Sequence, residues 1–118
     1  MRHRNTKAIL NRPVDQRKAM VRNLLTSLFL NGKVKTTDAR AKALASEAER
    51  LITKIKNKAE KHNAIKDLKK VIFTKESSLK ALAYAESTKK TSGFTRCTKL
   101  GMRAGDAATL IQVELIQD

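Results

Sequence analysis

The stretch VDQRKAMVRNLLTSLFLNGKVKTT, residues 14–37, decides the architecture, because it joins a helical pattern to a short strand pattern. At about 100° per residue, its larger apolar side chains fall on one arc of a helix, wide enough to cover a core. Gly32 is placed to take the left-handed conformation that ends a helix. Residues 33–37 are too few and too charged to form a strand alone, so we expect them to pair with a distant strand. The apolar arc consists of Val14, Val21, Leu24, Leu25, Leu28 and Phe29.

The opposite side of this predicted helix is small or uncharged, whereas a solvated helix face usually carries Lys and Glu. Arg17, Lys18 and Arg22 crowd the first two turns, at the end where the helix dipole is already positive. This placement weakens an isolated helix slightly, but it suits a helix whose start lies against a polyanion. The alternative interpretation is a core helix with a few surface cations.

Net charge indicates the class of partner. The 118 residues include 26 Lys and Arg against 11 Asp and Glu, which gives a formal net charge of +15. Such an excess destabilises a compact chain by self-repulsion unless an anionic partner neutralises it, and a nucleic-acid backbone is the expected partner. A membrane surface is the competing partner, but no apolar run approaches the roughly 20 residues of a membrane span. We therefore expect no membrane partner.

Several kinds of site are not expected from this sequence. The N-terminus lacks the apolar region of a secretory signal, and a single cysteine cannot form an intrachain disulfide, so we predict a cytoplasmic location. His3 and His62 lack companions at metal-ligand spacing, and no glycine-rich phosphate loop is present. Cys97 has no nearby His and is expected to be a packing residue. We predict no enzyme, cofactor, metal site or small-molecule substrate.

The first thirteen residues form a basic segment without sustained periodicity and without an acid. Basic arms of this kind usually become ordered on nucleic acid. Pro13 suits the first turn of a helix and disfavours helical geometry at the residue before it. We predict a basic N-terminal arm over residues 1–13 and a single globular α+β domain over residues 14–118. The cations of the arm are Arg2, Arg4, Lys7 and Arg12.

Three further helices are expected in the middle of the chain. Thr37 is a plausible N-cap for a helix over about residues 38–55, whose clean apolar stripe marks it as scaffold. Two shorter helical patterns follow, around residues 65–72 and 79–86, and an interruption at residues 74–78 separates them. Their mixture of Lys and Glu is typical of helices that cover a core and expose one face to solvent.

The C-terminal part predicts a hairpin. Residues 94–100 and 110–116 have strand patterns, and two glycines lie in the loop between them. In this loop we expect Asp106 to accept hydrogen bonds from turn amides, while Arg96 and Arg103 point at phosphate. The order helix, strand, three helices, two strands predicts a two-layer sandwich of helices on a small three-stranded mixed sheet.

Short segments carry a family resemblance through their order and spacing: Met1-Arg2-His3-Arg4, Arg17-Lys18-Ala19-Met20 followed by Arg22-Asn23, Lys35-Thr36-Thr37, Leu51-Ile52-Thr53, Gly93-Phe94-Thr95-Arg96, and residues 101–106 leading into Val113-Glu114-Leu115. On these segments the chain resembles the bacterial large-subunit ribosomal protein family numbered seventeen, over nearly its whole length. The resemblance implies a structural component of the large (50S) ribosomal subunit that binds the large-subunit (23S) ribosomal RNA. It also implies a position near the nascent-chain exit, in contact with the neighbouring ribosomal protein numbered thirty-two.

We expect phosphate contacts from the arm, the start of the first helix, the short strand and the hairpin, which suits structured RNA. The strongest rival is a small DNA-binding or nucleoid-associated protein, which should offer a dimer seam or a base-reading helix. An RNA-modifying enzyme would require a catalytic residue or a cofactor loop. The predicted RNA-binding residues are Arg2, His3, Arg4, Lys7, Arg12, Arg17, Lys18, Arg22, Lys35, Arg96, Lys99 and Arg103.

Overall fold

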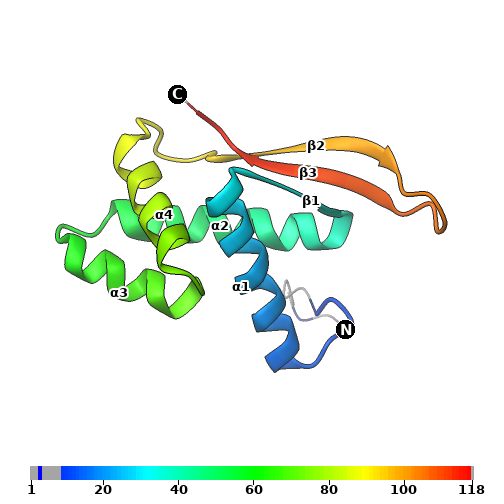
Figure 1. Ribbon diagram of the computed structural model, residues 1–118, viewed down its shortest axis with the longest axis horizontal. Helices are drawn as coiled ribbons and strands as arrows, with labels where there is room; N and C mark the ends of the chain where they lie inside the picture. The colour runs from blue at the N-terminus through cyan, green and yellow to red at the C-terminus, as the bar shows by residue number, and fades with distance from the viewer. Residues whose placement is uncertain (1–2, 4–8, 118) are drawn as a thin grey trace.

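A computed structural model of the chain describes residue 3 and residues 9–117, and these residues form an α+β fold (Figure 1). The predicted order of helix, strand, three helices and two strands is confirmed. Much of the predicted arm lies outside the described residues, including Arg2, Arg4 and Lys7. The elements are α1 (Val14–Asn31), β1 (Lys33–Thr37), α2 (Asp38–Lys56), α3 (Lys61–Val71), α4 (Lys75–Ser87), β2 (Thr95–Met102) and β3 (Thr109–Leu115).

The three strands form one sheet with the order β1-β3-β2, and both pairings are antiparallel. The prediction of a mixed sheet is therefore wrong. The hairpin loop makes β2 and β3 antiparallel, but nothing local to β1 indicates which way it runs along its distant partner. The register pairs Val34 of β1 with Val113 of β3, and Val113 with Cys97 of β2.

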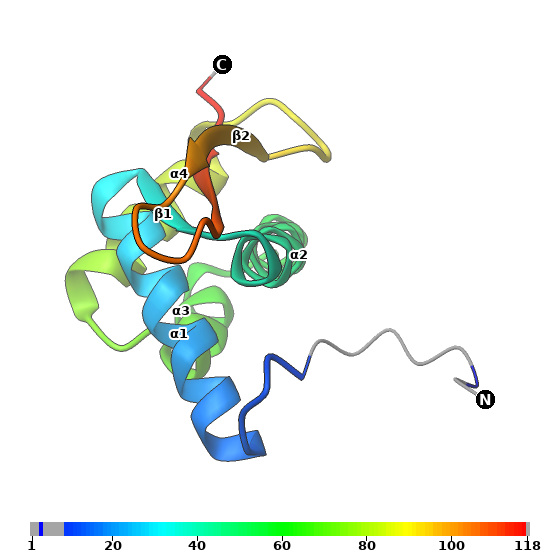
Figure 2. The ribbon, with the colours of Figure 1, turned by 90° about the vertical axis from the view of Figure 1, so that its right-hand side faces the viewer.

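The helices lie on one side of this sheet and make the second layer. Figure 1 shows β1, β3 and β2 running above α2, with α1 and α4 descending from the level of the sheet. In Figure 2, turned by 90°, α2 is seen end-on beneath the strands, and α1 passes beside it. In Figure 1, the part of the β2–β3 hairpin nearest its loop extends beyond the first turn of α2, on the side where β1 leads into this helix.

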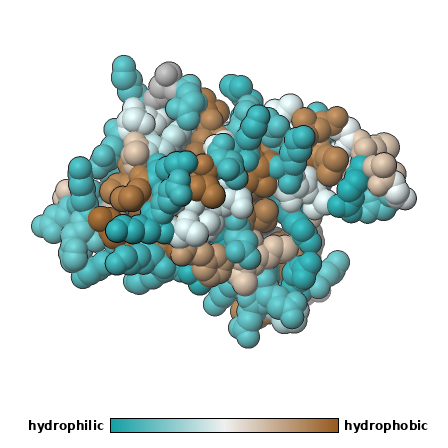
Figure 3. All heavy atoms as spheres, viewed as in Figure 1, coloured by the Kyte–Doolittle hydropathy of each residue, from teal (hydrophilic) through white to brown (hydrophobic). Residues whose placement is uncertain are grey.

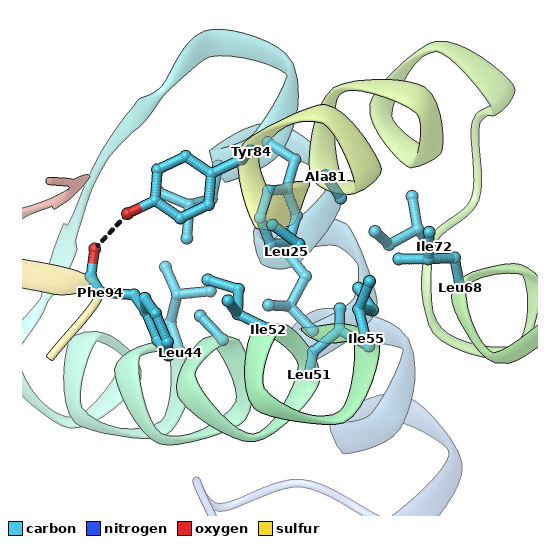
Figure 4. Packing of buried hydrophobic residues seen from close by; sticks show 14 of the residues in the cluster. Leu25, Leu44, Leu51, Ile52, Ile55, Leu68, Ile72, Ala81, Tyr84 and Phe94 are labelled. Carbon is cyan, nitrogen blue, oxygen red and sulfur yellow. Dashed lines mark hydrogen bonds between the residues drawn. The ribbon is translucent and has the colours of Figure 1, made fainter. Parts of the chain in front are cut away.

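The core lies between the sheet and the four helices and is built mainly of aliphatic side chains, together with Phe29, Tyr84 and Phe94 (Figure 4). Leu28, Leu44 and Ile52 are fully buried, which confirms the predicted apolar faces of the first two helices. Val14 is the exception on the predicted arc, since 49% of its surface is exposed. The first turn of α1 projects past the core, so a side chain there is not covered.

α1 ends as predicted at a glycine. Gly32 has a φ of 82°, and its amide donates to the carbonyl of Leu28 at 2.7 Å. This is the left-handed cap that only glycine adopts without strain. The last turn of α1 contains no basic residue, but the Lys80 ammonium of α4 donates to the carbonyl of Leu30 at 2.9 Å. The helix end is therefore satisfied from a neighbouring helix.

The predicted interruption at residues 74–78 is wrong, because α4 already begins at Lys75. Thr74 is its N-cap, and the Thr74 Oγ1 accepts a hydrogen bond from the amide of Ser77 at 3.3 Å. The buried Ser77 hydroxyl in turn donates to the carbonyl of Thr26 in α1 at 3.1 Å. The polar residues that break the apolar pattern are thus the cap and first turn of the helix.

Two polar side chains hold the base of the hairpin on the helices. The Glu49 Oε1 of α2 accepts hydrogen bonds from the amides of Phe94 (2.7 Å) and Thr95 (2.9 Å). The Tyr84 hydroxyl of α4 donates towards the carbonyls of Phe94 (3.1 Å) and Ile116 (2.6 Å), as Figure 4 shows for Phe94. Both ends of the hairpin are therefore fixed where they leave the core.

Candidate nucleic-acid interface

The charge excess appears on the surface as several groups of cations separated by strands and turns. Hydrophilic side chains cover most of the face seen in Figure 3, and hydrophobic patches interrupt them. The predicted binding residues Arg12, Lys18, Lys35, Arg96, Lys99 and Arg103 are exposed, as is His3, whereas Arg17 and Arg22 are half-buried.

The sheet separates the predicted cations of β1 and β2 between its two faces. Residues directly opposite one another in neighbouring strands share a face, and successive residues alternate. Val113 of β3 is fully buried, so its side chain faces the helices. Ile111, two residues before it, shares this face, and Lys99 of β2 therefore lies on the same face because it pairs with Ile111. Arg96 and Lys35 lie on the outer face, opposite Glu114 and Gln112 respectively. The structure therefore brings Lys35 and Arg96 to one surface but not Lys99.

On the outer face, Glu114 lies between two cations. Its register partners are Lys33 of β1 and Arg96 of β2, and the Arg96 guanidinium is 3.6 Å from the Glu114 carboxylate. An exposed pair of this kind contributes little to stability. Arg96 therefore keeps N–H donors free for a further anion, while its charge is partly neutralised by Glu114.

The hairpin loop is organised by a side-chain pair. The Arg103 guanidinium donates to both carboxylate oxygens of Asp106, with Nε 3.1 Å from Oδ1. The amide of Ala108 also donates to Asp106 Oδ1, at 3.2 Å. These hydrogen bonds, the one from Arg103 first, lower the pKa of the Asp106 carboxyl from its ordinary value of 3.8 to about 2.

The loop therefore agrees with the sequence in one respect and differs in another. Asp106 does accept a hydrogen bond from a turn amide, as predicted. Arg103, which was predicted to contact phosphate, also holds Asp106 with two of its nitrogens, a contact that the sequence did not indicate. A guanidinium has five N–H donors, so its third nitrogen, Nη1, remains available to an anion. Beside this loop, a bulge at Leu100 and the 77% exposed Met102 place apolar side chains on the surface.

The predicted cations of α1 have different surroundings. The Arg22 Nε donates to the carbonyl of Val71 at 3.1 Å, and its guanidinium lies 4.0 Å from the centre of the Phe73 ring. Arg22 therefore ties α1 to the last residue of α3 and to the segment that follows it, a structural role that its sequence position did not indicate. Lys18 is exposed and makes no ion pair within the described part of the chain.

A groove lies along the uncharged side of α1, the side that lacks solvated charges in the sequence. It has a volume of about 410 Å³. Arg12, just before the helix, and Arg40, in the first turn of α2, line it. The sequence does not predict Arg40 as a binding residue, because the clean apolar stripe of α2 indicates a helix that supports the core. One signal could have found it, since a cation in a helix's first turn is as disfavoured there as Arg17 is in α1.

The described residues offer little for other kinds of chemistry. They contain no group of three or more His, Cys, Asp and Glu that could hold a metal ion. Cys97 is an exposed thiol, which contradicts the predicted packing role, and partial burial raises its pKa, so it is not an activated thiolate. No helix in the described ranges is both long and apolar enough to cross a membrane.

Comparison with known proteins agrees with the resemblance seen in the sequence. The family described as Ribosomal protein L17 matches residues 20–116. A protein named large ribosomal subunit protein bL17 from Desulforapulum autotrophicum is 42% identical over 120 residues, which cover 100% of this chain and 98% of the relative. Proteins of the same name from Chloroflexus aurantiacus (40% identical, covering 98% of this chain and 100% of the relative) and Clostridium perfringens (42%, covering 91% and 95%) are also similar.

Proposed function

The chain belongs to the ribosomal protein L17 family, and from this premise we propose that it is a structural constituent of the large (50S) ribosomal subunit that binds the 23S ribosomal RNA. Its location would be the ribosome in the cytoplasm, where it supports translation without catalysing a reaction. The contacts would come from the basic arm, the start of α1, the outer face of the sheet and the hairpin loop.

The observation that carries this proposal is the set of exposed cations that have no carboxylate partner in the described structure. Lys18 and Lys35 belong to this set, and each lies on a different element. A net charge of +15 remains unbalanced on a chain of 118 residues, so an anionic partner would relieve repulsion within the fold. Unpaired cations on a helix and on a strand match a partner recognised by backbone and shape, as folded RNA is.

The same proposal includes neighbouring large-subunit proteins as partners, among them the one numbered thirty-two. The exposed apolar side chains of the hairpin, Leu100 and Met102, lie close together in sequence and suit a protein contact. Crosslinking from Met102→Cys in a Cys97→Ser background, performed in assembled subunits, tests this part. Crosslinks only to RNA from that position would contradict it.

The RNA-binding part is tested by measuring the affinity of the purified protein for 23S ribosomal RNA at several salt concentrations. If roughly 6–10 phosphates are contacted, the affinity should fall by about 10³–10⁵ between 50 and 200 mM salt. Excess duplex DNA serves as the competitor, because a DNA-binding protein would be displaced by it. A nearly flat salt dependence, or efficient displacement by duplex DNA, would contradict the proposal.

A matched pair of double variants locates the contacts. Lys18→Gln with Lys35→Gln removes two cations that have no acidic partner in the described structure. Lys42→Gln with Lys61→Gln removes two exposed cations that already pair with Asp38 and Glu86, at 3.7 and 3.2 Å. The first pair should weaken RNA binding and lower the salt slope by about two, whereas the second should leave both nearly unchanged. Equal effects from the two pairs would show that only net charge matters.

A further inference from the structure

The groove along α1 combines features that a site for a polynucleotide strand requires. Two arginines line it: Arg12 on the segment leading into α1, and Arg40 at the start of α2. The rest of the lining comes from α1 and includes the small or uncharged side chains of Ala19, Asn23 and Ser27. These positions recur at intervals of four residues, so they lie in one row along the helix.

Neither arginine has an ion-pair partner among the described residues. In the described part of the chain, no carboxylate lies within ion-pair distance of Arg12 or Arg40. The acid nearest in sequence to Arg40, Asp38, is paired with Lys42 at 3.7 Å. Arg22, by contrast, lies outside the groove and holds the carbonyl of Val71. The two groove arginines therefore keep their full donor sets for a ligand.

The approach to the groove is fixed by the backbone. The amide of Arg12 donates to the carbonyl of Ile9 at 3.3 Å, which closes a turn before α1. Within this turn Leu10 and Asn11 have φ values of 57° and 54°. At the next residue, the carbonyl of Pro13 accepts a hydrogen bond from the amide of Arg17 at 2.9 Å. Arg12 is therefore held beside the helix at the groove.

We propose that this groove binds a single strand of the RNA along its sugar–phosphate backbone, an inference that rests on the proposed function. Arg12 and Arg40 would each hold a phosphate through the planar fork that suits its oxygens. The amide of Asn23 and the hydroxyl of Ser27 would hydrogen-bond to ribose 2′-hydroxyl groups between them. A volume of about 410 Å³ lies within the roughly 300–1,000 Å³ typical of sites for small organic groups, so nucleotide units fit.

The chain's single cysteine makes a direct test possible. With Cys97 replaced by Ser, a cysteine introduced at Gln16 on the groove carries a tethered iron chelate that cleaves nearby RNA by hydroxyl radicals. Bound to 23S ribosomal RNA, this protein should cleave one defined segment strongly. The same chelate on Asn63→Cys, exposed on α3, serves as the control and should not cleave that segment.

The native cysteine separates failure of this inference from failure of the proposed function. A chelate on Cys97, exposed on β2, reports on RNA near the sheet. Cleavage from Cys97 without cleavage from Gln16→Cys would overturn the groove site and leave RNA binding intact. Absence of binding and of cleavage from every position would overturn both.

Matched arginine variants on α2 test the role of the Arg40 guanidinium. Arg40→Gln should weaken RNA binding roughly tenfold, the expected loss for a charge-assisted hydrogen bond. Arg50→Gln removes the same charge from the same helix, but Arg50 already pairs with Glu47 at 3.0 Å. The RNA affinity of the Arg50→Gln variant should therefore stay within about twofold of the wild type. Arg40→Lys should restore only part of the loss. Equal affinities for Arg40→Gln and Arg50→Gln, at unchanged melting temperature, would overturn the proposal.

A last variant addresses the ribose contacts. Asn23→Ala with Ser27→Ala keeps the charge and removes the two polar groups of the groove floor. This variant should lose preference for the cleaved RNA segment over a DNA strand of the same sequence, while binding of the DNA strand stays unchanged. An unchanged preference would show that the groove does not read the 2′-hydroxyl. Stronger crosslinking of the groove to an acidic protein than to RNA in assembled subunits would also overturn the site.

Discussion

Glu49, in the middle of α2, accepts hydrogen bonds from both the amide and the hydroxyl of Thr95, the first residue of β2 (2.9 and 3.1 Å). The same carboxylate oxygen accepts a third hydrogen bond, from the amide of Phe94. One acidic side chain therefore holds the start of a hairpin that begins 46 residues later in the sequence. Because hydrogen bonds to a charged acceptor are stronger than neutral ones, this contact is a main anchor of the hairpin base.

Glu49→Ala should lower the free energy of unfolding by about 1–3 kcal/mol, since it leaves two backbone amides and a hydroxyl without their acceptor. Urea denaturation followed by circular dichroism measures this. Glu47→Ala is the control on the same helix, because the ion pair of Glu47 in the described structure is with the exposed Arg50 and its loss should cost about 0.5 kcal/mol or less. Similar losses for both variants would show that the anchor is unimportant.

Tyr84→Phe should destabilise the fold by about 1–2 kcal/mol, because it removes one hydroxyl and keeps the buried ring. The Phe94 carbonyl would keep its hydrogen bond from the amide of Ile116 (2.9 Å), so the carbonyl of Ile116 loses more. Hydrogen exchange of the Ile116 amide should become faster than in the wild type, while exchange in α2 stays the same. Unchanged exchange at Ile116 would show that the Tyr84 hydroxyl does not hold the base of the hairpin.

Leu44→Ala should destabilise by about 2–5 kcal/mol, the usual range for truncating a fully buried leucine. Leu79→Ala is the matched control, since Leu79 is 54% exposed on α4 and its truncation should cost less than about 1 kcal/mol. Thermal or urea unfolding compares the two. RNA affinity, measured well below the melting temperature, should not change with Leu44→Ala, because this side chain faces the core.

The hairpin turn should respond to acid at an unusually low pH. The folded-state pKa of Asp106 is depressed to about 2, so its contribution is fully present above the ordinary value of 3.8 and is lost as the pH falls through about 2. An NMR titration of the Asp106 carboxyl carbon should give a midpoint near 2. Arg103→Gln should move the midpoint towards 3.8, since the guanidinium is the main cause of the shift. A midpoint near 3.8 in the unmodified protein would contradict the turn geometry.

The sequence predicts those parts of the fold that depend on local pattern. Gly32 ends α1 because the left-handed conformation is easiest for glycine, and Pro13 precedes the helix because its ring fits there. The hairpin follows from two strand patterns around a loop with glycines. The direction of β1 could not be predicted, because its partner β3 lies more than seventy residues later and no local feature links them.

The candidate site is less predictable, because sequence gives the sign of a charge but not its neighbours. Arg22, Arg96 and Arg103 all carry the charge that suggested phosphate binding, yet each has a partner within the fold. Period-two alternation could have shown that Arg96 and Lys99, three residues apart, lie on opposite faces. Arg40 was missed because its helix has a clean apolar stripe, and a scaffold helix can still present its first turn to a groove.

The pairing of β1 with β3 also constrains the order in which the chain can fold as it is synthesised. β1 is complete at residue 37, but four elements lie between it and its partner residues, 110–114. Until then the exposed edge of β1 has no partner strand, whereas α1 and α2 are adjacent in sequence and can pack early. Closing so long a loop slows the final step, because distant contacts form only after its entropy cost is met. We therefore expect the pairing of β1 with β3 to form after the helices have packed, and a chain shortened before β3 to leave packed helices beside an unpaired strand.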